Sequence, residues 1–98
     1  MSLAVVLRHQ AAEELLAACD YLEGQREGLS IRLIDEVRRV IDRISIHPEL
    51  HGIVLKDIRR AAVRRFPYSI FYRVTPARID VLAVFHDSRD PAEWQRRL

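Results

Sequence analysis

The sequence is poor in cysteine and glycine. Cys19 is the only cysteine in 98 residues, which excludes an internal disulfide, and it falls at an apolar position of a helical pattern where a small buried thiol packs well. The three glycines, Gly24, Gly28 and Gly52, stand apart from one another. Scattered glycines build neither a phosphate-binding loop nor a flexible linker. We therefore expect a single domain, residues 1–98, without a nucleotide cofactor.

Signals for a membrane, for export and for a metal are also missing. No apolar run approaches the roughly 18 residues of a membrane span, and the first residues lack the basic and apolar regions of a secretory signal. His47 and His51 lie four residues apart, but Pro48 interrupts the helix that would align them, and Glu49 alone does not complete a ligand set. We expect no metal, no cofactor, and a role in the bacterial cytoplasm.

Charge is distributed unevenly along the chain. The composition, 49% hydrophobic and 31% charged, is that of a globular domain. Residues 1–57 carry 7 basic and 10 acidic side chains, whereas residues 58–98 carry 9 basic and 4 acidic ones, a balance of −3 against +5. The basic half favours contact with an acidic partner or a nucleic acid, and the alternative is ordinary solvation of exposed strand faces.

Hydrophobic spacing predicts an α+β domain. Residues 3–8 form a short apolar run typical of a strand, and two segments with apolar residues every three or four positions, 10–25 and 30–47, predict an antiparallel helical hairpin. Segments rich in β-branched and aromatic residues then predict a three-stranded antiparallel meander, and the last segment predicts a short helix; they are 58–66, 68–74, 79–85 and 91–98.

The predicted order is β-α-α-β-β-β(α), with the hairpin packed on one face of a mainly antiparallel twisted sheet. The N-terminal strand joins the same sheet, giving four strands. The continuous apolar run 81–85 indicates a strand covered on both faces. Asp90 before Pro91 predicts the start of the terminal helix, and we expect residues 91–98 to add little to the core.

Two phrases near the end of the chain carry a family resemblance. Residues 64–74 read Arg-Arg-Phe-Pro-Tyr-Ser-Ile-Phe-Tyr-Arg-Val, and residues 84–91 read Val-Phe-His-Asp-Ser-Arg-Asp-Pro, followed by Trp94. Together with the helical stretch at 11–15 and the proline turn at 48–52, they resemble the RelE/ParE superfamily of toxins from type II toxin–antitoxin systems. The resemblance covers nearly the whole chain.

The aromatic-proline-tyrosine phrase and the His-x-x-Arg-x-Pro-x-x-Trp ending are similar to the ParE-like, plasmid-stabilisation branch, and Lys56 is the only lysine, whereas RelE-like RNases carry more. The resemblance implies a toxin that inhibits DNA gyrase without catalysis and is neutralised by a cognate antitoxin with an acidic, disordered segment. The alternative is a ribosome-dependent mRNA endoribonuclease of the RelE type.

Arginines dominate the candidate binding residues. On the predicted strand 58–66, alternation places Arg59 and Arg65 on one face and Arg60 and Arg64 on the other. Either these side chains are simply solvated or they contact the antitoxin, gyrase or RNA phosphate. The residues predicted to bind the target or the antitoxin are Arg59, Arg60, Arg64, Arg65, Arg73, Arg89 and Trp94.

Under the lead interpretation no residue is catalytic. An RNase must promote attack by a 2′-hydroxyl, stabilise the developing charge and protonate the leaving oxygen. The residues able to do so are His86, Arg65, Tyr72, Arg73 and Arg89. In a purely local interpretation, His86 packs or caps and Arg89 pairs with Asp87 or Asp90. Tyr72 is expected on the core side of its strand, with only its hydroxyl near solvent.

Overall fold

The computed structural model describes residues 2–98. Its elements are β1 (Val5–Leu7), α1 (His9–Gln25), α2 (Leu29–Ile46), β2 (Ile53–Leu55), β3 (Ile58–Ala62), β4 (Tyr68–Val74), β5 (Ile79–His86) and α3 (Ala92–Gln95). The strands form one sheet in the order β1-β5-β4-β3-β2. Only the β1–β5 pair is parallel. The α+β class, the helical hairpin and the mainly antiparallel sheet are confirmed.

The sheet has five strands rather than the expected four. Strand β2 is three residues long and lies at the edge, where Ile53 and Val54 are exposed. The turn after it contains Lys56 with a φ of 53°, a left-handed conformation that lets β3 return antiparallel to β2. Three residues are too few to establish a period-two pattern, so this strand was not predicted from the sequence.

The helical hairpin turns at Gly28. This residue has a φ of 88°, a conformation that glycine adopts without the steric cost of a Cβ atom, and it precedes the first residue of α2. The carboxylate of Glu23 accepts hydrogen bonds from the Gly28 and Ser30 backbone N–H groups at 3.0 and 3.1 Å. Donors at the start of α2 are thereby satisfied from α1.

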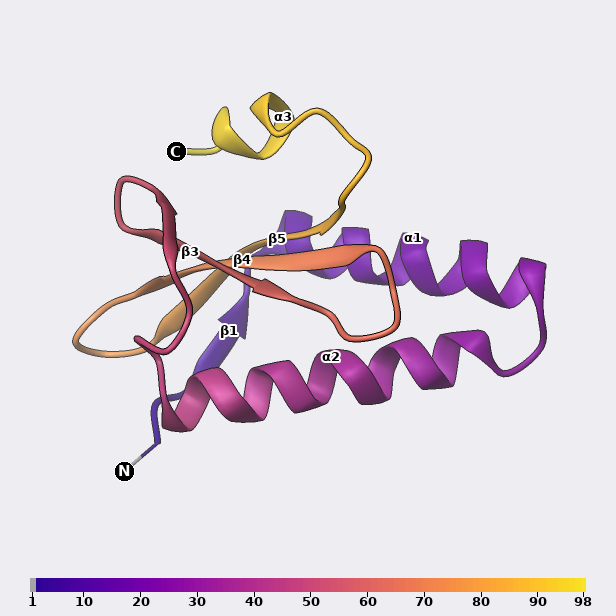
Figure 1. The fold of residues 1–98 in the computed structure, drawn as a ribbon, viewed down its shortest axis with the longest axis horizontal. Helices are drawn as coiled ribbons and strands as arrows, with labels where there is room; N and C mark the ends of the chain where they lie inside the picture. The colour runs from indigo at the N-terminus through magenta and orange to yellow at the C-terminus, as the bar shows by residue number, and fades with distance from the viewer. Residues whose placement is uncertain (1) are drawn as a thin grey trace.

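The two faces of the sheet carry separate apolar clusters, with the hairpin α1–α2 on one side and α3 on the other (Figure 1). Side chains from β5 serve both, as its apolar run predicted. Its register skips one residue, since Phe71 pairs with Ala83 and Tyr72 pairs with Val81. This bulge places Leu82 and Ala83 in the same cluster, beneath α3.

Strand β3 ends earlier than expected, at Ala62. Residues 63–67 form the connection to β4, closed by a hydrogen bond of 2.9 Å from the Val63 N–H to the Tyr68 carbonyl. Arg64 and Arg65 therefore lie in a turn, and Arg65 has a φ of 71°. The predicted sharing of strand faces by Arg59 with Arg65, and by Arg60 with Arg64, is wrong because strand alternation stops at Ala62.

Candidate functional site

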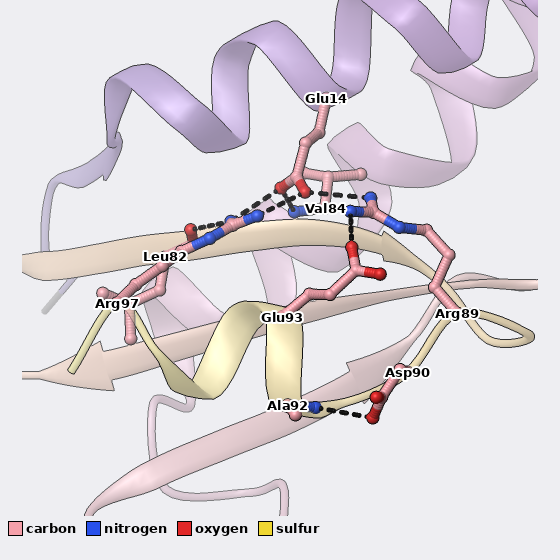
Figure 2. Close-up of polar contacts among 8 residues, drawn as sticks. All are labelled: Glu14, Leu82, Val84, Arg89, Asp90, Ala92, Glu93 and Arg97. Atoms are coloured by element: carbon pink, nitrogen blue, oxygen red, sulfur yellow. Dashed lines mark hydrogen bonds and ion pairs between the residues drawn. The ribbon is translucent and has the colours of Figure 1, made fainter.

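Side chains complete the edge of the sheet where β1 stops. Strand β1 pairs only with residues 79–81 of β5, so the outer backbone groups of the following residues lack a neighbouring strand. The Val84 N–H donates to Glu14 Oε1 at 3.1 Å, and an Arg97 guanidinium nitrogen donates to the Leu82 carbonyl at 3.0 Å (Figure 2). A carboxylate from α1 and a guanidinium from the C-terminus thus replace strand partners.

The same carboxylate ties two C-terminal arginines to the body of the protein (Figure 2). Arg97 donates two hydrogen bonds to Glu14, at 2.9 and 2.7 Å. Both side chains are only 14% and 13% exposed. Arg89 donates to Glu14 at 3.2 Å and also to Glu93, and its hydrogen bond to Glu93 raises its pKa further. The local pairing of Arg89 with Asp87 or Asp90 is therefore wrong.

The C-terminal segment is part of the core. Trp94 is 2% exposed and stacks on Phe71 with ring centroids 4.3 Å apart, while the Arg89 guanidinium lies 4.1 Å from the centre of the Phe85 ring. The expectation that residues 91–98 contribute little to the core is wrong. Trp94 was predicted to contact a partner, and in this fold its indole is largely enclosed and lines a groove.

His86 lies at the end of β5, opposite Tyr68 in the register and with ring centroids 5.0 Å apart. Its Nδ1 accepts a hydrogen bond of 3.0 Å from the Ser88 N–H, which fixes the orientation of the ring. It lines the rim of an apolar groove of about 250 Å³ floored by Phe71, Phe85 and Trp94. This placement matches the local packing interpretation.

Two of the strand arginines point to opposite faces. Arg60 lies 3.6 Å from Asp87, whose carboxylate also accepts a 2.7 Å hydrogen bond from the buried Ser69 hydroxyl. Arg59 faces the helices and donates to the His51 carbonyl at 2.6 Å and to the Glu49 carbonyl at 3.2 Å. Arg59 thus holds the loop between α2 and β2 against the sheet.

Tyr72 supports the same loop. Its side chain is fully buried, and its hydroxyl donates to the Pro48 carbonyl at 3.0 Å. The expected exposure of that hydroxyl is wrong because residues 48–51 cover it. Burial raises the pKa of Tyr72, and beside it burial and then the charges of Arg43 and Arg59 lower the pKa of His51. Both shifts favour the neutral form of the group.

The residues considered for RNA cleavage do not assemble. Arg73 pairs with Asp57 at 2.9 Å. On β4, Arg73 lies five residues from Tyr68, which is the residue opposite His86. At the rise of an extended strand, that separation is about 17 Å. Tyr72 is buried under the loop 48–51, and Arg65 projects from the turn 63–67 into a groove beside α2. Only His86 and Arg89 remain close to one another.

Among the predicted binding residues, Arg64 and Arg65 alone are exposed without an ion pair or a side-chain hydrogen bond inside residues 2–98. Sequence reasoning missed Glu14 and Arg97, which lie 83 positions apart. It also missed Arg26 and Arg32, which share a groove with Arg65. No local spacing signals either grouping, because each is created by packing between distant elements.

The structure defines a small α+β domain in which the residues considered for RNA cleavage lie at separate places among residues 2–98. Residues 5–91 match the family model for the ParE toxin of the type II toxin–antitoxin system parDE. The chain belongs to this family and is a type II toxin, as the sequence resemblance predicted. No curated protein matches the chain.

A solved structure described as the chromosomal ParDE TA system from P. aeruginosa has the same fold, with a TM-score of 0.75 and 16% sequence identity. The superposition covers 87% of this chain and 96% of that one. The family defines an antitoxin as the partner class. Within residues 2–98, no helix is long and apolar enough to cross a membrane.

Proposed function

We propose that this toxin arrests growth by binding DNA gyrase stoichiometrically, and that its cognate antitoxin neutralises it through an acidic segment. Family membership supports the proposal, and the observation that carries it is the dispersal of the RNase candidates over separate places in the fold. The toxin acts in the cytoplasm, where this target is found, and residues 1–98 act as one unit.

The chemistry of RNA cleavage argues in the same direction. A general acid or base must lie within about 3 Å of the proton that it transfers, with phosphate-binding groups beside it. Arginine side chains stay protonated and do not exchange protons at neutral pH. Tyr72 is enclosed and its pKa is raised, so among the residues considered for cleavage His86 is the one proton carrier near Arg89. A binding mechanism needs no such assembly.

The direct test is a gyrase supercoiling assay with increasing amounts of purified toxin, with a parallel gel for trapped cleaved DNA. We expect inhibition to become complete near an equimolar ratio of toxin to gyrase. The cognate antitoxin should reverse it. Full supercoiling activity at several-fold excess of folded toxin contradicts the gyrase proposal.

His86→Asn separates the two candidate activities. The asparagine side-chain oxygen can replace Nδ1 as acceptor for the Ser88 N–H, but the amide does not titrate near neutral pH and so cannot act as a general acid or base. Gyrase inhibition and growth arrest should persist in this variant. Codon-positioned cuts in cellular mRNA, seen by primer extension with the parent toxin and lost in folded His86→Asn, favour the RNase instead.

A further inference from the structure

A basic groove lies on the opposite side of the protein from α3, between the first half of α2 and the β3–β4 turn. Figure 1 shows this turn beside α2, toward the end of the hairpin where α1 and α2 connect. The groove has a volume of about 530 Å³. Its lining consists of Arg26, Leu29, Arg32, Asp35, Glu36, Arg39, Arg65 and Phe66.

Three of its four arginines are uncommitted. Arg39 pairs with the buried Glu36 at 2.8 Å. Arg26, Arg32 and Arg65 are exposed and have neither an ion pair nor a side-chain hydrogen bond within the described part of the chain. The lining holds four arginines and two acidic residues, Asp35 and Glu36, so positive charge is in excess. A ligand that supplies carboxylates or phosphates to the unpaired guanidinium groups therefore gains more there than at an isolated arginine.

The backbone presents these groups in fixed positions. Arg32 and Arg39 lie seven residues apart on α2, two helical turns or about 10.5 Å along the axis. Arg65 reaches the groove from a left-handed backbone conformation, φ 71°, that is unfavourable for a residue with a Cβ atom. Strain of this kind persists where the surrounding structure imposes it and is concentrated at binding sites.

We propose that the groove binds an acidic, amphipathic segment of a partner protein. Its carboxylates pair with Arg26, Arg32 and Arg65, and its apolar side chains pack on the half-buried Leu29 and Phe66. A nucleic acid fits less well, because a run of phosphates offers nothing to the apolar floor. This inference does not depend on gyrase being the target.

The test is an NMR titration of the full-length toxin with a helical probe peptide of about 15 residues, in which Glu recurs at three- and four-residue spacing with Leu between. Two further probes are the same peptide with Gln for Glu and single-stranded DNA of equal charge. The double variant Arg32→Glu/Arg65→Glu removes the site. Arg38→Glu/Arg43→Glu is the matched control, because both arginines are exposed on α2 outside the groove and the charge change is equal.

The Glu peptide should shift the backbone signals of residues 29–39 and 63–67, and Arg32→Glu/Arg65→Glu should weaken its binding about tenfold or more. The control should weaken it less than about threefold through long-range charge alone. A peptide with Lys for Glu should then bind the groove variant better than the parent, which excludes misfolding as the cause. Equal losses in both double variants, or tighter binding of DNA through the same residues, overturn the proposal.

Discussion

The two ends of the molecule use arginine in opposite ways. Near the C-terminus, Arg89 and Arg97 converge on Glu14, and the carboxylate and Arg97 are both largely buried. At the hairpin end, Arg26, Arg32 and Arg65 converge on a groove in which the acidic Glu36 is already occupied by Arg39. One cluster is neutralised within the protein, and the other is left with an excess of positive charge.

This difference shows why a count of basic residues does not locate a binding surface. The basic half of the sequence contains Arg89 and Arg97, yet these side chains hold the sheet edge and α3 in place. The acidic half contributes Arg26 and Arg32 to the surface that is open to a partner. A guanidinium with a partly buried carboxylate partner stabilises the fold, whereas an exposed unpaired one contributes little to stability and is available for binding.

The largest expected change in stability comes from Trp94→Ala, in the C-terminal segment. Loss of the stack on Phe71 and of a buried indole should lower the free energy of unfolding by about 3–5 kcal/mol. Urea unfolding followed by circular dichroism measures the loss. Gln95→Ala, at the exposed neighbouring position, should change stability by less than about 0.5 kcal/mol. Equal effects of the two variants contradict the structural role of Trp94.

The next effect in size comes from Glu14→Gln. The uncharged amide keeps the shape but leaves Arg89 and the poorly exposed Arg97 without their shared counter-charge. We expect a loss of about 2–3 kcal/mol, measured by the same unfolding experiment. Glu13→Gln is the control, because its carboxylate is exposed and pairs with His9 at the surface, so its loss should be within about 0.5 kcal/mol.

The sequence predicted the elements whose period repeats over many residues. Both helices and the doubly covered strand β5 follow from apolar spacing, because burial on one face or on both leaves a regular pattern. Strand β2 and the early end of β3 were not predictable, since each depends on a tight left-handed turn, at Lys56 and at Arg65, in residues that usually avoid that conformation.

The candidate site was less predictable than the fold. Its residues are brought together by packing between distant elements. Glu14 and Arg97 are 83 positions apart. Arg26 and Arg65 line the same groove because the β3–β4 turn lies beside the helical hairpin. Tyr72 was assigned correctly to the core face, but its hydroxyl is covered by a loop whose path the sequence does not encode locally. The sequence pattern therefore identified which kinds of residue form the site, but not which of them lie close together in the fold.

In the basic groove, Arg65→Gly should weaken peptide binding without lowering the stability of the fold. Glycine adopts the left-handed conformation at no steric cost, which offsets its larger loss of backbone entropy on folding, so the free energy of unfolding should be unchanged or rise by up to about 1 kcal/mol. Binding of the acidic probe peptide should weaken, because a guanidinium is lost. Arg64→Gly at the adjacent exposed position outside the groove should lower stability slightly, by about 0.5 kcal/mol, and leave peptide binding intact.

The smallest effect concerns Glu23, a carboxylate near the groove that accepts three hydrogen bonds. Glu23 accepts from the Gly28 and Ser30 N–H groups and from the Ser30 hydroxyl, and these bonds, that from Gly28 first, lower its pKa. No arginine is among its partners, so the charge excess of the groove is not relieved by it.

A lowered pKa in the folded state means that the unfolded chain takes up a proton first as the pH falls. Glu23 therefore stabilises the fold above its unfolded pKa, about 4.3, and this contribution disappears as the pH falls through the lower folded value. Thermal unfolding of the parent and of Glu23→Gln, measured from about pH 7 to pH 3, should show midpoints that differ at neutral pH and converge in acid. Glu27→Gln, in the same connection and without a side-chain partner in residues 2–98, should follow the parent at every pH. A Glu23→Gln difference that persists at the acid end means that the carboxylate acts through its shape and not its charge.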